Sequence, residues 1–509
     1  MTPRFYVTTP IYYVNGAPHI GHAYTSIAAD VVARFYRLSG YDVFFLTGTD
    51  EHGQKVEQAA KNAGVTPRVF ADNVSADFRH MADSMNISYD AFIRTTEPRH
   101  ITSAQNLWRK VAENGAIYLG AYEGWYSVRD ECFYSEDELI TTEEEKKCAP
   151  TGAPVEWVKE PSYFFKLSVF QEPLLELYER NPDFLGPHGV RNEIISFVKQ
   201  GLRDLSISRT SFQWGIPVPD DEHHVMYVWF DALTNYLSAL GYPDETAPLM
   251  VYWPAALHLV GKDIARFHAV YWPAFLMAAG IELPHKIFAN GWWTVEGQKM
   301  SKSLGNVVNP RDLLQEFSLD SIRFFLLREV PFGGDSDLSR KALITRNNVE
   351  LANDLGNLAQ RTLSLVARYC DGVVPEKGEQ TKDDIKLLGQ VHVLPDVLAL
   401  QFKRCALTDA LEEVWKVIRA SNVYIARQEP WTLRKTDPIR MASVLRVLLE
   451  ALRGIATVLQ PFMPETMARL LDQLGVSDDE RLFSALNTPI PTGRSLPAPQ
   501  GIFPRYPEE

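Results

Sequence analysis

Residues 5–24, FYVTTPIYYVNGAPHIGHAY, decide the fold of this chain. The apolar start at residues 5–7 is typical of a short buried strand, and residues 15–18 (NGAP) are typical of a turn. Apolar side chains then recur at three- and four-residue steps from Ile27 to Leu38, before Gly40. This spacing predicts a helix. The chain therefore begins as a strand, a tight turn and a helix.

Two histidines, His19 and His22, lie at the start of that helix. Their three-residue spacing lets both rings lie on one helix face, and Gly21 lets a ligand approach the backbone. A helix N-terminus presents N–H groups and the positive end of a dipole to an anion. Two imidazoles there can also stabilise a phosphate that gains charge in a transition state. Taken alone, however, an HxGH sequence is more often an ordinary helix start with two partly buried histidines.

A second motif, KMSKS, follows at residues 299–303. Together with HIGH at residues 19–22, it resembles the paired signatures of class I aminoacyl-tRNA synthetases. Residues 10–16 (PIYYVNG) and 49–53 (TDEHG) narrow the resemblance to the methionyl-tRNA synthetase family, and it extends to about residue 465. It implies an α/β fold: a Rossmann-type catalytic domain with a connective insertion, followed by an all-α helix-bundle anticodon-binding domain.

The resemblance and the changes of pattern along the chain predict six segments. They are the first half of the Rossmann catalytic domain (1–117), the connective insertion (118–226), the second half of the Rossmann domain (227–290), the KMSKS and stem-contact region (291–345), the helical anticodon-binding domain (346–475) and a proline-rich C-terminal tail (476–509). We expect the tail to pack loosely over the bundle. Residues 226–233 are expected to run from a strand into a helix.

The connective insertion carries zinc in many relatives, bound by paired cysteines and a histidine. The matching positions here are Ser127, Asp130, Cys148 and Thr151. A structural zinc site normally has four Cys or His ligands, so we expect no zinc and assign no metal ligands. The insertion is also too short for the hydrolytic editing domain of the leucine, isoleucine and valine enzymes.

A methionine-binding set is implied by the resemblance. Residues 41–46 predict a buried strand with Asp50 just beyond it, where ligands bind at the carboxyl ends of parallel strands. In the family, this carboxylate faces the α-amino group; the simpler alternative is a helix cap. The remaining pocket residues are Ile11, Tyr13, Trp229, Ala232, Leu233, Tyr236, Ile264 and His268. By periodicity alone, the apolar members are ordinary core residues.

An apolar cage with aromatic walls suits a thioether. Because one missing methyl group changes binding by only ~1–3 kcal/mol, homocysteine is expected to be activated as well.

The resemblance also implies ATP-binding and catalytic residues. The ATP-binding set is His19, Gly21, His22, Gly261, Asp263, Lys299, Ser301 and Lys302, of which His19, His22, Lys299 and Lys302 are catalytic. The lysine ammonium groups can neutralise the departing pyrophosphate. Without the full motif, two lysines at this spacing would indicate only a solvated basic loop. Mg²⁺ is expected to accompany ATP, held mainly by phosphate oxygens.

Beyond Arg340, apolar residues at helical spacing predict a helix bundle. The resemblance implies that Asn357, Arg361, Pro430 and Trp431 read the anticodon. A base stacked on an aromatic ring contributes ~1–3 kcal/mol. Without the resemblance, a core anchor at a helix end describes Trp431 equally well.

Composition sets broader limits on the 509-residue chain. Its net charge of −13 does not by itself indicate a nucleic-acid partner, although residues 402–454 are locally basic. The four cysteines form no disulfide-like framework, and the N-terminus does not look like a removable targeting segment. We therefore expect a cytoplasmic protein without a membrane partner. We also expect a monomer, because the tail leaves no room for the dimerising domain of some relatives.

The resemblance implies that the chain is a methionine–tRNA ligase. It would activate L-methionine with ATP to methionyl-adenylate and pyrophosphate, then transfer methionine to the 3′ end of initiator and elongator tRNA(Met). One alternative is a class I synthetase for another amino acid. The other is a non-catalytic tRNA-binding relative, in which the motifs would be expected to be broken.

Overall fold

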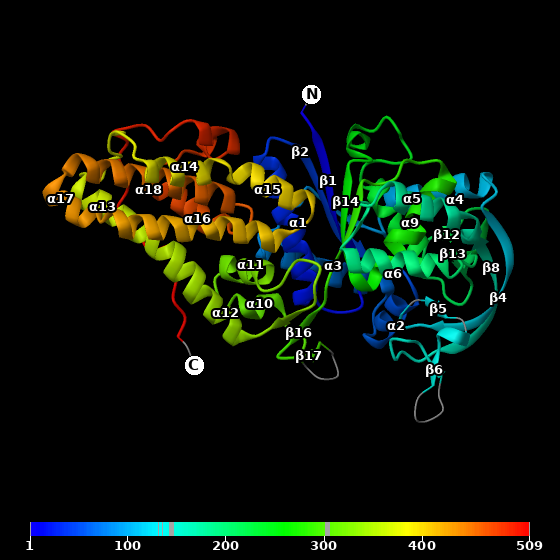
Figure 1. Cartoon of the computed structure of the whole chain (residues 1–509). Helices are drawn as coiled ribbons and strands as arrows, with labels where there is room; N and C mark the ends of the chain where they lie inside the picture. The colour runs from blue at the N-terminus through cyan, green and yellow to red at the C-terminus, as the bar shows by residue number, and fades with distance from the viewer. Residues whose placement is uncertain (1, 131, 135, 142–146, 301–305, 508–509) are drawn as a thin grey trace. The chain divides into compact units, whose positions relative to one another are not determined.

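The computed structural model describes residues 2–130, 132–134, 136–141, 147–300 and 306–507 (Figure 1). It divides into two compact units. The first, called here the sheet unit, contains residues 4–18 and 44–290. The second, the helical unit, contains residues 1–3, 19–43 and 291–509. The strand and the helix of the opening motif therefore belong to different units.

The sheet unit is built around a six-stranded sheet (Figure 1). The strand order is β3 (Ala91–Arg94), β2 (Asp42–Asp50), β1 (Arg4–Tyr13), β14 (Ala256–Gly261), β15 (Lys286–Asn290) and β9 (Leu185–Gly186). The β2–β3, β1–β14, β14–β15 and β15–β9 pairs are parallel. The order reverses direction between β1 and β14, which is the topological switch point of a doubly wound sheet. This confirms the predicted Rossmann-type fold.

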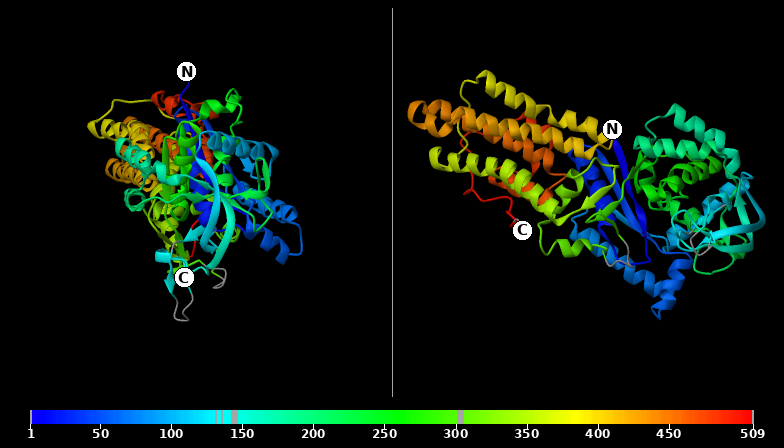
Figure 2. Two further views of the ribbon diagram at one scale, coloured as in Figure 1. Left: turned by 90° about the vertical axis from the view of Figure 1, so that its right-hand side faces the viewer. Right: turned by 60° about the horizontal axis from the view of Figure 1, so that its bottom comes forward.

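The central strands are buried because both faces of the sheet are covered, as is usual in parallel sheets. Every residue of β2 after Asp42 is buried, and Tyr6 and Leu46 belong to the main core. Helices α4 (Pro98–Glu113) and α9 (Trp272–Ala279) supply Trp108 and Phe275 to the same core. Figure 2 shows the same ribbon from two further directions.

Residues 118–226 contribute both an antiparallel sheet and part of the parallel one. Strands β4 (Ile117–Ser127) and β8 (Glu156–Phe165) pair along ten positions in a four-stranded antiparallel sheet. The two-residue strand β9, however, pairs with β15 in the parallel sheet, between α5 (Gln171–Arg180) and α6 (His188–Lys199). Part of the expected insertion therefore forms an edge of the Rossmann sheet, and two residues carry too little periodicity to predict it.

The expected run from strand into helix at residues 226–233 is present. Strand β13 (Asp221–Met226) ends at Met226, and α7 (Val228–Leu233) begins two residues later.

Three of the four positions matched to the zinc ligands of relatives, Ser127, Asp130 and Thr151, are linked here by hydrogen bonds. The backbone N–H of Asp130 donates to the Ser127 hydroxyl at 3.2 Å, and the Asp130 carboxylate accepts from the Thr151 hydroxyl and from Tyr134. Cys148 is buried. Among the residues with assigned positions, no group of three or more His, Cys, Asp or Glu is arranged to hold a metal.

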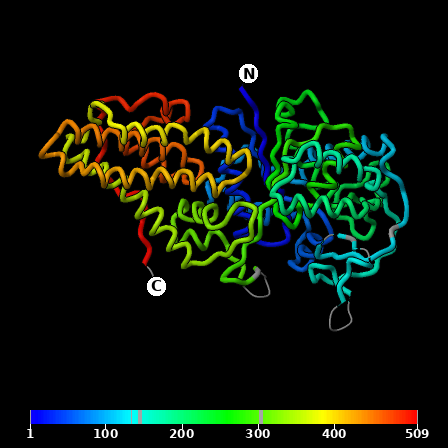
Figure 3. Tube along the Cα trace, in the orientation of Figure 1, coloured from blue at the N-terminus to red at the C-terminus, as the bar shows by residue number. Residues whose placement is uncertain are grey.

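The helical unit joins α1 (Ile20–Leu38) to the C-terminal helices. Phe35 of α1 stacks on Phe402 of α15 (Leu394–Lys403) with ring centroids 3.8 Å apart. The fully buried Arg323 of α11 (Leu319–Arg328) donates to Asp30 of α1 at 2.6 Å. Longer helices, α16 (Leu407–Gln428) and α18 (Pro438–Leu459), form the centre of the bundle (Figure 3). The predicted helix bundle is confirmed.

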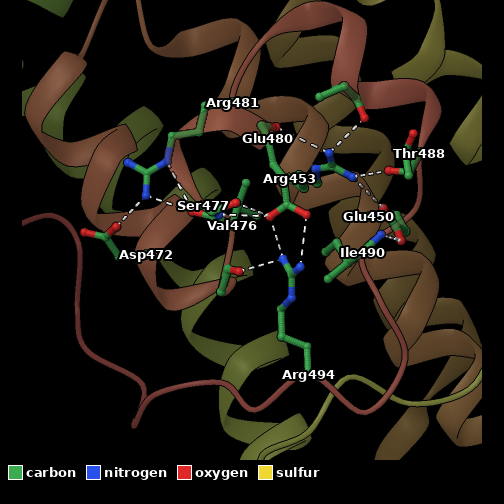
Figure 4. A network of polar contacts seen from close by, with 12 residues as sticks. Glu450, Arg453, Asp472, Val476, Ser477, Glu480, Arg481, Thr488, Ile490 and Arg494 are labelled. Carbon is green, nitrogen blue, oxygen red and sulfur yellow. Dashed lines mark hydrogen bonds and ion pairs between the residues drawn. The ribbon is translucent and has the colours of Figure 1, made fainter.

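The C-terminal tail is held by specific polar contacts, so the expectation of loose packing was wrong. Figure 4 shows Arg494 paired with Glu480 at 2.6 Å, and Arg453 of α18 donating to tail carbonyls, among them that of Thr488. Arg446 similarly donates to the carbonyl of Ile490. Arginine side chains buried in the bundle need acceptors, and the backbone of the tail supplies them.

No helix in the described ranges combines the length and apolar character needed to cross a membrane.

Candidate active site and anticodon-contact residues

The predicted phosphate-binding histidines form the N-terminal cap of α1. The backbone N–H of Gly21 donates to His19 Nδ1, and the backbone N–H of His19 donates to His22 Nδ1, each at 3.1 Å. The two rings stack with centroids 3.7 Å apart. Because Nδ1 accepts in both rings, the N–H of each neutral ring is at Nε2. That tautomer suits donation to a phosphate oxygen.

Gly21 has a steric role in this cap. A Cβ atom at position 21 would lie 3.0 Å from Cε1 of His19, closer than ordinary van der Waals contact. A larger residue would therefore displace the His19 ring from its capping position.

The segment with the KMSKS motif belongs to the same unit as α1. Strand β17 (Gln298–Lys299) pairs with β16 (Trp293–Val295), and Trp293 packs edge-on against Tyr24 of α1 at 5.4 Å. The backbone N–H of Ile20 also donates to the carbonyl of Val308 at 3.0 Å. Residues on both sides of the KMSKS motif, Trp293 before it and Val308 after it, therefore contact α1. Ser301 and Lys302 lie outside the described residues, as does the Lys299 side chain.

The predicted methionine-binding residues of the sheet unit come from neighbouring elements. Ile11 and Tyr13 lie at the carboxyl end of β1, and Trp229, Ala232 and Leu233 lie on α7. Tyr236 is on α8 (Asn235–Ser238), Ile264 ends the turn η4 (Lys262–Ile264), and His268 lies in the π-helical η5 (Phe267–Tyr271). Leu233 and Tyr236 are buried in the main core, and the half-buried Ile11, Tyr13, Trp229 and Ile264 pack against it.

One polar pair, Tyr236 and His268, crosses this apolar cluster. His268 Nδ1 faces the carbonyl of Ile264 at 3.0 Å, so it carries the proton, and Nε2 accepts from the Tyr236 hydroxyl at 2.6 Å. Burial lowers the pKa of His268 to about 4, although the Ile264 carbonyl opposes this shift. The imidazole is therefore neutral near pH 7 and adds no charge to the predicted methionine pocket.

The remaining ligand-binding residues predicted in the sheet unit lie at or just after the carboxyl ends of β2 and β14. Asp50 ends β2 and is buried, and its backbone carbonyl accepts from Val14 at 3.1 Å. Gly261 ends β14, where a Cβ atom would collide with the Asp263 carboxylate. The predicted residues of β1, β2 and β14 therefore lie along one edge of the sheet, where ligands bind in such folds.

Two of the predicted anticodon residues are brought together in the helical unit. The Arg361 guanidinium of α13 (Asn357–Tyr369) lies 5.5 Å from the ring centroid of Trp431 on α17 (Pro430–Thr436). Trp431 is 40% exposed, and Pro430 is buried. Asn357 is exposed at the start of α13. An exposed ring beside a cation is a suitable surface for stacking a nucleobase.

The structure also contains a polar cluster that the sequence did not predict. Asp231 of α7 accepts from His52 Nδ1 and from His100 Nε2, both at 2.7 Å. Burial alone would raise the pKa of Asp231, but the two imidazoles outweigh burial and lower that pKa to about 2. His52 is part of the TDEHG motif. The other two residues carried no local signal, because the three positions are far apart in the chain.

A cavity of about 420 Å³ lies in the helical unit beside α14 (Lys382–His392) and α18. Its lining includes apolar Leu388 and Val447, together with Arg446 and Glu450, which pair at 3.0 Å. None of the predicted ligand-binding residues lines it.

Comparisons with known proteins agree along the whole chain. The model of the class I tRNA synthetases (M) matches residues 5–363, and that of the anticodon-binding domain of methionyl-tRNA ligase matches residues 374–509. Methionine–tRNA ligase of Brucella suis is 54% identical over 99% of this chain and 98% of its own length. The corresponding enzyme of Rickettsia felis is 55% identical, over 99% of both chains.

Solved structures give the same result. Mycobacterium tuberculosis methionyl-tRNA synthetase in complex with methionyl-adenylate is 50% identical, with a TM-score of 0.97 over 99% of this chain and 100% of that one. Its apo form has a TM-score of 0.91 and 47% identity, over 100% of this chain and 99% of that one. These matches, together with the parallel sheet and the capped histidine helix, show that the chain belongs to the methionyl-tRNA synthetase family of class I tRNA synthetases.

Proposed function

We propose that this chain is a methionine–tRNA ligase that works in two steps. The carboxylate of L-methionine attacks the α-phosphate of ATP, which gives methionyl-adenylate and releases pyrophosphate. The terminal ribose hydroxyl of tRNA(Met) then attacks the carbonyl of the adenylate, and AMP leaves. The observation that carries this proposal is that the catalytic and anticodon-binding family models together match residues 5–363 and 374–509 of one chain.

The amino acid is held by the residues of the sheet unit. Ile11, Tyr13, Trp229, Ala232, Leu233, Tyr236 and Ile264 enclose the thioether side chain, and His268 fixes the Tyr236 hydroxyl. Asp50 pairs with the ammonium group. Support comes from the neutral state of His268, since burial lowers the pKa of its ring to about 4, and from the half-buried rings packed against the core.

ATP is bound by the residues of the two motifs and of β14. The Nε2 atoms of His19 and His22 donate to phosphate oxygens, and Gly21 keeps the backbone close. Gly261 and Asp263 contact the nucleoside, while Lys299, Ser301 and Lys302 hold the β- and γ-phosphates. Catalysis then rests on orientation and on neutralising phosphate charge. The capping geometry supports this role of the histidines, because both Nδ1 atoms accept backbone hydrogen bonds, which puts the ring hydrogen of each on Nε2, the atom that donates to phosphate.

The helical unit recognises tRNA(Met), both the initiator and the elongator form. Trp431 and Pro430 offer the surface on which an anticodon base stacks, while Arg361 and Asn357 contact base edges and phosphates. The proximity of Arg361 and Trp431 supports this assignment. Because both tRNAs share one anticodon, a single surface serves both.

Three further properties complete the proposal. Mg²⁺ enters bound to ATP, since its preferred ligands are phosphate oxygens and water. The chain acts as a monomer, which light scattering on the purified protein tests. It acts in the cytoplasm, where its tRNA substrates are used.

ATP–pyrophosphate exchange with each of the twenty amino acids and homocysteine tests the first step. We expect exchange with methionine, weaker exchange with homocysteine, and a large loss in Lys302→Ala. Stronger exchange with another standard amino acid would refute the assigned pocket. Aminoacylation of initiator and elongator tRNA(Met) transcripts tests the second step. If folded protein with Mg²⁺ and tRNA gave neither reaction, a non-catalytic tRNA-binding role would replace the proposal.

A further inference from the structure

The cluster of Asp231, His52 and His100 lies inside the sheet unit, and the mechanism above does not use it. All three residues are buried, with at most 5% of their surface exposed. Each carboxylate oxygen accepts from a different imidazole, at 2.7 Å in both cases. An ionised carboxylate only accepts hydrogen bonds. The ring nitrogens that face it, His52 Nδ1 and His100 Nε2, are therefore the ones that carry the hydrogen. Charge-assisted bonds of this kind are about twice as strong as neutral ones.

His52 belongs to the turn that follows Asp50. The other side of this turn is also fixed: the Trp214 indole N–H donates to the carbonyl of Glu51 at 2.5 Å, and Gly53 N–H donates to the carbonyl of Trp214 at 2.9 Å. The Glu51 carboxylate is buried and pairs with Arg94 at 2.6 Å. The His52 side chain connects this turn to α7 through its hydrogen bond to Asp231.

Asp231 lies on α7, two residues after the proposed pocket residue Trp229 and immediately before Ala232. His100 extends the connection, because its Nδ1 faces the Ser238 hydroxyl at 2.8 Å. Ser238 is on α8, two residues after Tyr236. One carboxylate therefore joins the turn with the proposed ammonium ligand to both helices with the proposed thioether pocket.

We propose that Asp231 is a positioning residue that holds the Asp50 turn against α7, and so sets the spacing between the ammonium site and the thioether pocket. This inference rests on the proposed methionine pocket. A carboxylate is needed because its two oxygens accept from two imidazoles at once, whereas an amide has one accepting oxygen. Misplacement of a substrate-positioning group by about 1 Å can reduce a rate ~100-fold.

Variants of His52 test the proposal in the full-length protein, by ATP–pyrophosphate exchange. His52→Ala removes the donor, whereas His52→Asn keeps an N–H close to the position of Nδ1. Ser103→Ala is the matched control: Ser103 lies on α4, one turn after His100, and its buried hydroxyl donates to the carbonyl of Tyr242. It therefore reports the effect of losing a buried hydrogen bond away from the Asp50 turn.

We expect His52→Ala to raise the KM for methionine about 10-fold or more, with the KM for ATP within twofold of wild type. His52→Asn is expected to restore most of this loss, and Ser103→Ala to leave both constants within twofold. A His52→Ala enzyme with an unchanged KM for methionine would overturn the proposal. So would equal rises for methionine and ATP, or His52→Asn no better than His52→Ala.

Asp231→Asn covers the case in which His52→Ala does not fold. The asparagine side chain has the same shape as aspartate, but its single amide oxygen can accept from only one imidazole. The same selective rise in the KM for methionine is therefore expected for Asp231→Asn, and absence of that rise overturns the proposal. The wild-type enzyme separates the two levels of inference. If wild type exchanges best with another amino acid, the proposed function fails; if wild type prefers methionine but the variants show no selective effect, only the positioning role fails.

Discussion

Arg323→Met is expected to loosen the attachment of α1, the helix that presents His19 and His22. The Arg323 guanidinium donates to Asp30 Oδ2 at 2.6 Å, to the carbonyl of Pro461 at 2.9 Å and to that of Phe462 at 3.1 Å. The side chains of Arg323 and Asp30 are both 0% exposed. Methionine keeps the apolar stem but removes the guanidinium, and with it these hydrogen bonds.

The size of the effect follows from these contacts. Breaking a buried ion pair by removing one partner destabilises by about 3–5 kcal/mol. Asp30 keeps a second partner, because Arg34 Nε remains 2.7 Å away, so the lower end, about 3 kcal/mol, is expected. Each 1.4 kcal/mol is a factor of ten, and the amides of α1 should therefore exchange hydrogen about 100-fold faster.

Hydrogen exchange of peptides from residues 20–38 is the appropriate assay. A chain with two compact units is not expected to unfold in one step, whereas exchange reports local opening. Arg34→Met is the control, since it removes a guanidinium from the same carboxylate oxygen but from a side chain that is 22% exposed. Its effect should stay below about 1 kcal/mol. The reasoning is refuted if Arg323→Met exchanges within threefold of wild type, or no faster than Arg34→Met.

Three further predictions concern separate parts of the chain. Tyr236→Phe leaves His268 Nε2 without its hydrogen-bond donor. Calorimetry should therefore show that the stability of the sheet unit falls by about 1–3 kcal/mol, and kinetics should show a higher KM for methionine. An unchanged melting temperature would contradict the hydrogen bond. Burial raises the pKa of Asp384, but hydrogen bonds, chiefly from Arg440, lower it from 3.8 to about 2. The ionised carboxylate therefore stabilises the helical unit above about pH 4, and this contribution is lost as the pH falls towards 2; Asp384→Asn should be less stable at pH 7 and flatten the acid-unfolding profile, and an unaltered profile would exclude this linkage. Trp431→Ala should raise the KM for tRNA(Met) about 10-fold or more while pyrophosphate exchange stays constant, and equal losses in both assays would instead indicate a structural anchor.

Much of the catalytic architecture was predictable because it is encoded locally. The apolar run of β1, the turn and the periodic face of α1 each occupy a short stretch. Helix α1 ends at Leu38 as predicted, whereas β1 continues six residues beyond the predicted strand at 5–7, to Tyr13. His19 and His22 were predicted to share a face, and their rings stack. The helices beyond Arg340 were predictable for the same reason, since a 3.6-residue period shows in any short window.

Side-chain roles within these elements needed more than periodicity. Trp229, Leu233 and Tyr236 have the pattern of ordinary core residues, and only their likeness to a known family assigned them to a pocket. The predicted residues at the ends of β1, β2 and β14 share one edge of the sheet. This followed from the topology, because the three strands end on the same side. The partner of Trp431 was likewise decided by how α13 and α17 pack, which placed Arg361 beside it.

The sequence by itself therefore determined the opening strand and helix, the helical character of the chain beyond Arg340 and the motifs with ligand-binding chemistry. Only the tertiary structure decided which polar groups meet. His52 and His100 lie 179 and 131 positions from Asp231, β9 joins the parallel sheet through two residues, and Arg446 and Arg453 anchor a tail that seemed loose. The physical reason is that hydrophobic periodicity records which face is buried, whereas a buried charge or hydrogen bond depends on the partner that the chain path brings within 3 Å.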